Sequence, residues 1–113
     1  MRREQRLTSS SQFDAVFKNG KVWATDVAVL RTMPNGLEVS RFGIIVSKRV
    51  GKKAVVRNRV KRLLREVLRL TPTQSGWDVI IIARPLAAEA GYREIEAGIL
   101  GLLNRAGLLG ELR

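Results

Sequence analysis

Residues 47–70 read SKRVGKKAVVRNRVKRLLREVLRL, and this stretch determines how the rest of the chain can fold. Its apolar residues recur at the i, i+4, i+7, i+8 and i+11 spacing of an amphipathic helix, which we place at residues 56–70. The other side of that helix carries Asn58, Arg62, Arg65 and Arg69, with Arg57 and Lys61 on one flank and Arg59 and Glu66 on the other. One side can therefore pack on a sheet while the other presents a row of guanidinium groups.

The charge of the chain is concentrated in and around this helix. Residues 41–69 contain eleven of the 21 lysines and arginines but only one of the ten acidic residues. Like charges at i, i+4 destabilise a helix, so a solvated basic face with no partner explains this pattern poorly. Guanidinium groups bind phosphate through two parallel hydrogen bonds, and a polyanion would neutralise the face. We therefore favour a nucleic acid as partner, with an anionic membrane surface second.

Length and composition predict a single domain over residues 1–113, with flexible segments at 1–7 and 107–113. Hydrophobic residues make up 45% of the chain, which is enough for a core. No run is long enough to cross a bilayer, and the first residues lack the apolar stretch of a signal peptide. The absence of cysteine argues against a disulfide framework or a thiolate metal site. Together these features suit the cytoplasm.

The chain also contains no histidine, which removes imidazole from any catalytic or metal-binding scheme. The ten carboxylates are scattered, and no two lie close together on one expected strand, where they could form a metal pair. Such an inventory is poorly suited to cleaving a phosphodiester without help. We therefore assign no catalytic residue and no metal site to the protein.

The segments before the basic helix predict one helix and three strands. A short helix follows the capping residues 8–11 and ends at the Asn19-Gly20 pair. Residues 21–33 are extended, with a break at 25–26 that divides them into two strands. Pro34, Asn35 and Gly36 form a turn, and residues 37–47 continue as a strand, so this pair of strands resembles a hairpin.

A basic loop at residues 48–55 precedes the central helix, and a strand and a helix follow that helix. The loop carries Lys48, Arg49, Lys52 and Lys53. Residues 77–83 (WDVIIIA) are a continuous apolar run, which predicts a buried strand, and residues 92–106 predict the last helix. The result is an α+β domain with one sheet and helices packed on it.

Several of these segments together resemble the bacterial ribonuclease P protein subunit. The runs FGIIVSKRVG (42–51) and AVVRNRVKRLLRE (54–66) are similar to its signature, whose hallmark is an Arg-Asn-Arg triplet, here residues 57–59. The run QFDAVFKNG (12–20) resembles its opening helix, and DVIIIARP (78–85) resembles its last strand. The resemblance covers about residues 6–103.

This resemblance implies both a fold and an activity. The fold is αβββαβα, a four-stranded sheet with a left-handed βαβ crossover, of the ribosomal protein S5 domain 2 type. The large RNA of ribonuclease P binds most of the Mg²⁺ and cleaves the 5′ leader from precursor tRNA. The protein is implied to bind that RNA and the single-stranded leader, and to lower the Mg²⁺ requirement. Neither DNA nor a membrane is an expected partner.

The residues implied to act are carried over by their positions. Those implied to contact RNA are Arg57, Asn58, Arg59, Lys61, Arg62, Arg65 and Arg69 on the helix and Lys48, Arg49, Lys52 and Lys53 in the loop. The leader is implied to lie between the sheet and the opening helix, near Phe13, Phe17, Lys18 and Arg31. Arg31 stands where some relatives have a tyrosine, so it could stack on a base or pair with a phosphate. From the residues alone, core packing is the favoured explanation of both phenylalanines, and stacking on an unpaired base is the alternative.

Three other functions remain open from the residues alone. The basic helix also suits a non-catalytic RNA-binding module, such as a ribosome-associated protein. A protein nuclease is less compatible with the missing histidine, and a membrane-surface role conflicts with the need of the helix to pack on the sheet.

Overall fold

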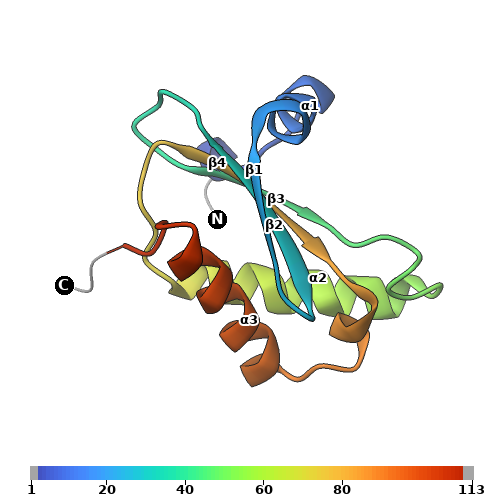
Figure 1. Ribbon diagram of the computed structural model, residues 1–113. Coiled ribbons are helices and arrows are strands. Elements are labelled where there is room, and N and C mark those ends of the chain that lie inside the picture. The colour runs from blue at the N-terminus through green and yellow to red at the C-terminus, as the bar shows by residue number, and fades with distance from the viewer. Residues whose placement is uncertain (1–2, 111–113) are drawn as a thin grey trace.

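The structure is a computed structural model that describes residues 3–110, and Figure 1 shows the order of its helices and strands. The elements along the chain are η1 (Arg3–Gln5), α1 (Ser10–Asn19), β1 (Lys21–Ala24), β2 (Ala28–Pro34), β3 (Arg41–Ile45), α2 (Ala54–Leu70), β4 (Trp77–Ala83), η2 (Pro85–Ala88) and α3 (Tyr92–Arg105). This order confirms the predicted single αβββαβα domain. Helix α2 begins two residues earlier than predicted, so the basic loop is residues 48–53.

The strands form one mixed sheet in the order β1-β2-β4-β3, in which only β3 and β4 are parallel. Strand β4 lies inside the sheet because its side chains are apolar on both faces. Val79 and Ile81 are buried on one face and Ile80 on the other. The predicted hairpin between the second and third strands is therefore wrong, since β4 lies between β2 and β3.

The third strand is also shorter than the predicted segment at residues 37–47. Residues 37–40 instead belong to a loop that side chains hold in place. The Leu37 N–H donates to Asn35 Oδ1 at 2.8 Å, and Asn35 Nδ2 donates to the Val39 carbonyl at 3.1 Å. These bonds replace a strand ladder and let the chain pass the end of β4 before β3 begins.

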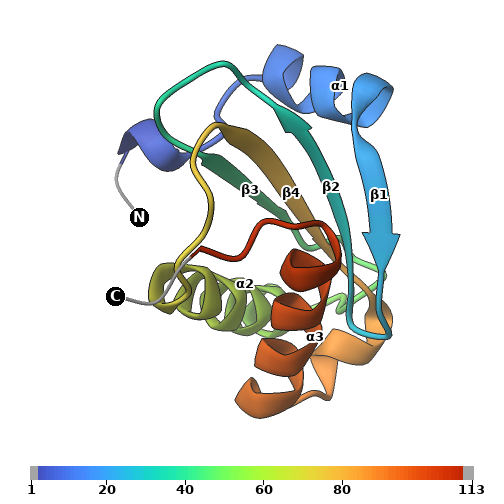
Figure 2. The same ribbon diagram turned by 60° about the vertical axis from the view of Figure 1, so that its left-hand side comes forward.

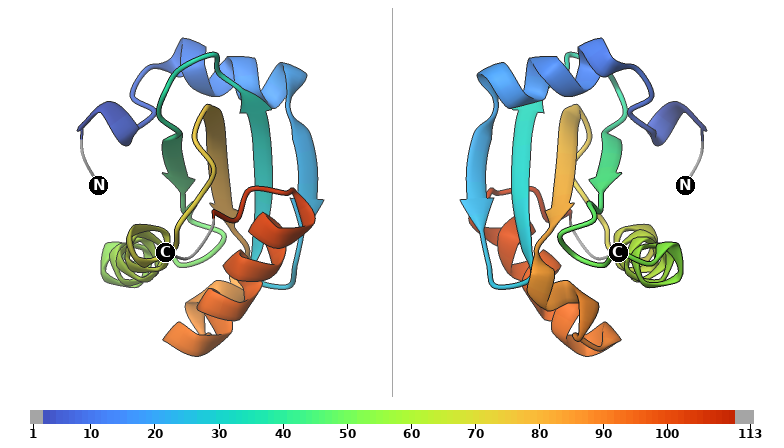
Figure 3. Two further views of the ribbon diagram at one scale, coloured as in Figure 1. Left: turned by 90° about the vertical axis from the view of Figure 1, so that its left-hand side faces the viewer. Right: turned by 90° about the vertical axis from the view of Figure 1, so that its right-hand side faces the viewer.

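Helices α2 and α3 cover one face of the sheet, and α1 lies across the other, as Figures 2 and 3 show. On the first face, Leu30 and Ile81 of the strands are fully buried against Val60 and Leu64 of α2 and Ile99 of α3. On the second, a smaller core joins Leu7, Val16 and Ile80. The amphipathic reading of the central helix is confirmed, because its apolar side supplies much of the larger core.

The chain passes from β3 through α2 to the neighbouring parallel strand β4. In the left view of Figure 3, both strands run downward, α2 lies in front of the sheet, and β4 lies to the right of β3. This arrangement is the left-handed crossover that the resemblance implies, and it is rare between parallel strands. It places α2 beside the outer edge of β3, so that the polar side of the helix faces away from the sheet.

A buried ion pair joins β3 to β4 near the start of both strands. Arg41 Nε and Nη2 donate to the two carboxylate oxygens of Asp78 at 2.8 and 2.7 Å. Asn35 Nδ2 adds a third bond to Asp78 at 2.9 Å. Because Asp78 is only 5% exposed, these donors replace the water that its charge would otherwise need.

The ends of the described part pack on the domain. The Leu7 N–H donates to the Phe42 carbonyl at 2.9 Å, and Leu108 is buried. The flexibility expected for residues 1–7 and 107–113 stays a prediction, and residues 1–2 and 111–113 lie outside the described range. Between residues 3 and 110, no helix combines the length and apolarity needed to span a membrane.

Candidate nucleic-acid interface

Helix α2 exposes a row of polar side chains, which we call the basic stripe: Asn58, Arg62, Arg65 and Arg69. All four are exposed, whereas Val60, Leu64, Val67 and Leu68 on the opposite side are buried. Lys61 is half-buried beside the stripe. The helical spacing of the sequence therefore predicts which cations reach solvent.

Not every cation of α2 is equally available to a ligand. Arg69 pairs with Glu66 through bonds of 2.6 and 3.2 Å, and this hydrogen bonding lowers the pKa of Glu66. Arg57 and Arg59 are half-buried, and their guanidinium groups donate to backbone carbonyls within the protein. Among the arginines of the helix, Arg62 and Arg65 are thus the exposed pair in the middle of the stripe.

The basic loop extends this charged surface beyond the start of α2. Lys48, Arg49, Lys52 and Lys53 are all exposed, while Val50 between them is buried and anchors the loop. A cationic N-cap region opposes the positive end of the helix dipole, so an anion bound here would relieve repulsion. Loop and stripe together place exposed cations along α2 and beyond its first turn.

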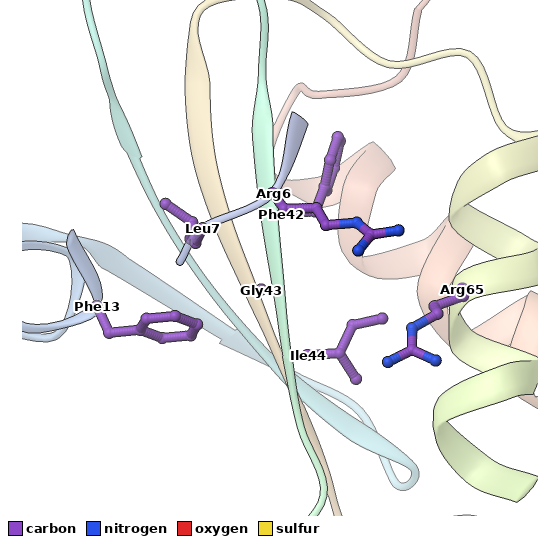
Figure 4. Close-up of a pocket in the computed structure, with 7 residues that line it drawn as sticks. All are labelled: Arg6, Leu7, Phe13, Phe42, Gly43, Ile44 and Arg65. Atoms are coloured by element: carbon purple, nitrogen blue, oxygen red, sulfur yellow. The ribbon is translucent and has the colours of Figure 1, made fainter. Parts of the chain in front are cut away.

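A pocket of about 200 Å³ lies at the outer edge of the sheet, next to the basic stripe. We call it the β3 pocket, and its lining residues are Arg6, Leu7, Phe13, Phe42, Gly43, Ile44 and Arg65. Figure 4 shows the ring of Phe13 reaching toward Gly43 from α1, while the guanidinium groups of Arg6 and Arg65 extend toward Ile44 from the other side. The pocket thus combines an aromatic ring with two cations.

The position of Phe13 depends on the missing side chain of Gly43. A Cβ built on Gly43 would lie 2.6 Å from two atoms of the Phe13 ring, which is closer than such atoms can approach. Gly43 pairs across the sheet with Ile80, which in turn pairs with Arg31 of β2. Phe13 therefore lies over the β3 end of this row of residues.

Phe17 occupies the other end of the same row and has different surroundings. The Arg31 guanidinium carbon lies 5.2 Å from the centre of the Phe17 ring, and Arg31 Nη1 donates to the Phe17 carbonyl at 3.2 Å. Phe17 is 38% exposed, but the Arg31 side chain covers part of the ring. Lys18 is exposed at the end of α1 and does not line the β3 pocket.

Of the seven residues that line the β3 pocket, only Phe13 and Arg65 are among the site residues predicted from the sequence. Arg6 and Gly43 are the two missed residues that bear most on its chemistry and shape. Arg6 lies within the segment expected to be flexible, and its place beside β3 depends on a bridge to Phe42 that no local pattern indicates. Gly43 lies within the signature run, but its role follows only from the approach of Phe13. Within residues 3–110, no three histidine, cysteine or acidic side chains gather to form a possible metal site.

Comparison with known proteins identifies the family of this cationic domain. A model of the Ribonuclease P family matches residues 1–107. The chain belongs to the bacterial ribonuclease P protein family. A ribonuclease P protein component from Dehalococcoides mccartyi is 44% identical over 109 residues, which is 96% of this chain and 90% of that protein. One from Roseiflexus castenholzii is 41% identical over 112 residues, covering 96% of this chain and 91% of that one.

Solved structures of ribonuclease P proteins share the fold. The Staphylococcus aureus protein superposes with a TM-score of 0.86 at 29% identity and covers 94% of this chain and 98% of its own. The Thermotoga maritima protein superposes with a TM-score of 0.77 at 32% identity and covers 88% of this chain and 96% of its own. The ribonuclease P protein assists the RNA-catalysed removal of the 5′ leader from precursor tRNA, and its holoenzyme is an endoribonuclease. Its partner is the ribonuclease P RNA.

Proposed function

We propose that this chain binds ribonuclease P RNA through the basic stripe and loop, and the single-stranded 5′ leader of precursor tRNA through the β3 pocket. The main support for assigning the leader and the ribonuclease P RNA to different surfaces is the pocket itself. It holds the Phe13 ring on one side of β3 and the Arg65 guanidinium on the other. Arg65 belongs to both surfaces, so the two RNA molecules would meet along α2.

The chemistry of the pocket suits a strand of variable sequence. Every base has a π-face, so stacking on Phe13 is worth about 1–3 kcal/mol without strong sequence preference. Arg6 and Arg65 would pair with phosphates, which are the same in every leader. Lys18 at the C-terminal end of α1 and Arg31 of β2 beside it would attract the leader as it leaves the pocket.

The cations also bear on the Mg²⁺ requirement of the reaction. Two polyanions repel each other at the site where they meet, and Mg²⁺ reduces this repulsion when it binds to RNA. Protein cations that contact phosphates release counterions and reduce the repulsion in the same way. We propose that the protein lowers the Mg²⁺ concentration needed for cleavage, with the ions bound mainly by the RNA, and that it acts in the cytoplasm.

Phe13→Ala should weaken binding of a precursor tRNA with a long leader by roughly 5- to 150-fold, because one stacking contact is lost. Phe17→Ala should cost less than about fivefold, because Arg31 already covers part of that ring. Gly43→Ala should resemble Phe13→Ala, since its Cβ displaces the Phe13 ring. Dissociation constants of the reconstituted holoenzyme would measure all three effects.

A precursor with a single leader nucleotide is the matched control for these variants. It retains the tRNA body but leaves the β3 pocket without a strand, so all three variants should bind it as the wild type does. Equal losses with the long and the short leader would contradict leader binding in the pocket.

A further inference from the structure

Two members of the Arg57-Asn58-Arg59 triplet direct their guanidinium groups into the protein. Asn58 between them is exposed, whereas both arginines are half-buried. The hydrogen bonds of these arginines run to the backbone of segments that lie outside α2. The triplet thus combines one residue that faces solvent with two that hold other parts of the chain.

Arg59 joins α2 to the corner between η2 and α3. Its Nη1 donates to the Ala88 carbonyl at 3.2 Å, and its Nη2 donates to the Ala90 carbonyl at 3.1 Å. The corner is compact, because Ala87 and Ala90 are buried against the larger core. The two acceptors belong to different residues, and the planar fork of an arginine reaches each of them with a separate nitrogen, whereas a lysine has one nitrogen to share between them.

Arg57 holds the basic loop against the start of α2. Its Nη1 donates to the Gly51 carbonyl at 2.8 Å and to the Lys52 carbonyl at 2.7 Å. Gly51 lies close to Val56, since a Cβ there would be 2.7 Å from a Val56 methyl group. The bonds of Arg57 thus fix the direction in which Lys52 and its neighbours leave the helix.

We propose that Arg57 and Arg59 are positioning residues, which fix the basic loop and the η2–α3 corner to α2 while exposed neighbours contact the RNA. Each of these arginines commits two of its five N–H donors to backbone carbonyls, and each is half-buried, so a phosphate contact would compete with bonds that hold other segments in place. The inference rests on the proposed function of α2 and assigns different tasks to its arginines.

Arg59→Lys and Arg59→Gln distinguish a positioning role of this residue from direct RNA binding. Arg62→Lys and Arg62→Gln are the matched variants in the basic stripe. Lysine keeps the charge but loses the fork, whereas glutamine loses the charge. Two measurements are needed: the affinity for ribonuclease P RNA across a salt series, and amide hydrogen exchange of the free protein. The second requires no RNA, so it is independent of the proposed function.

We expect Arg59→Lys to speed amide exchange across residues 88–95 by about tenfold or more, because bonds from a charged group to the backbone are lost. It should also weaken RNA binding, with an unchanged salt dependence. Arg62→Lys should leave this exchange unchanged. Arg62→Gln should reduce the slope of log affinity against log salt by about 0.7–0.9, and Arg59→Gln by less than about 0.3.

Two results together would overturn the positioning role. Arg59→Lys would show wild-type amide exchange and RNA binding, and Arg59→Gln would reduce the salt slope as much as Arg62→Gln does. An unchanged slope in Arg62→Gln would instead contradict RNA binding by the stripe, and the exchange data would still decide the role of Arg59. For Arg57, Arg57→Ala should speed exchange at residues 50–56, and unchanged exchange there would contradict its role.

Discussion

Replacing Arg62 and Arg65 together by alanine is expected to weaken the binding of ribonuclease P RNA by roughly 100-fold at moderate salt. Hydrogen bonds to charged groups contribute about 1.5 kcal/mol or more each, and both residues stand exposed in the middle of the basic stripe. Within residues 3–110, neither side chain makes a hydrogen bond that would have to break before it could bind RNA. The loss therefore reports contacts with RNA more than a change in the fold.

The salt dependence of the same binding provides a second measure. Two lost phosphate contacts should reduce the slope of log affinity against log salt by about 1.4–1.8. Lys21→Ala with Arg93→Ala is the matched control, because both residues are exposed on other elements and the net charge changes equally. If the control variant weakens binding as much as the stripe variant, net charge rather than the stripe governs association.

Asp78→Ala is expected to destabilise the domain by about 3–5 kcal/mol, which is a large part of the stability of a small protein. The substitution leaves the Arg41 guanidinium half-buried without its carboxylate and removes one of the two acceptors of Asn35 Nδ2. The Asp78 hydrogen bond raises the pKa of Arg41 in the folded protein, and arginine stays charged without it. An uncompensated cation would then remain between β3 and β4.

Urea unfolding would measure this loss, and Glu66→Ala provides the comparison. Glu66 pairs with Arg69 on the surface of α2, so its removal should move the urea midpoint little. Replacing Arg41 and Asp78 together by apolar residues should cost less than Asp78→Ala alone, because no charge is left unpaired. Equal midpoints for Asp78→Ala and Glu66→Ala would show that the buried pair does not hold β3 to β4.

The parts of the fold that depend on local pattern could be predicted from the sequence. The 3.6-residue period of residues 56–70 predicts both the buried side of α2 and the exposed basic stripe. The order of the strands in the sheet could not be predicted from such local patterns. Strands β2 and β3 follow each other across a strong turn, but β4, which comes more than 30 residues after β3, pairs with both of them.

The candidate site shows the same division between local and long-range information. Phe13 and Phe17 are equivalent by helical spacing, yet one meets Gly43 of β3 and the other meets Arg31 of β2. Arg57 and Arg59 share a motif with Asn58, but their acceptors are carbonyls of a loop and of a distant corner. Which cation is exposed and available to a ligand therefore depends on tertiary contacts that the motif does not encode.

Cleavage of a precursor tRNA at low Mg²⁺ tests the central claim most directly. The reaction would be measured with ribonuclease P RNA alone, with this protein alone, and with both, using a long and a single-nucleotide leader. We predict that only the mixture cleaves efficiently at the 5′ junction, and that the long leader gains more from the protein. A mixture no faster than the RNA alone, with a protein that still binds RNA, would contradict the account and favour a general RNA-binding module.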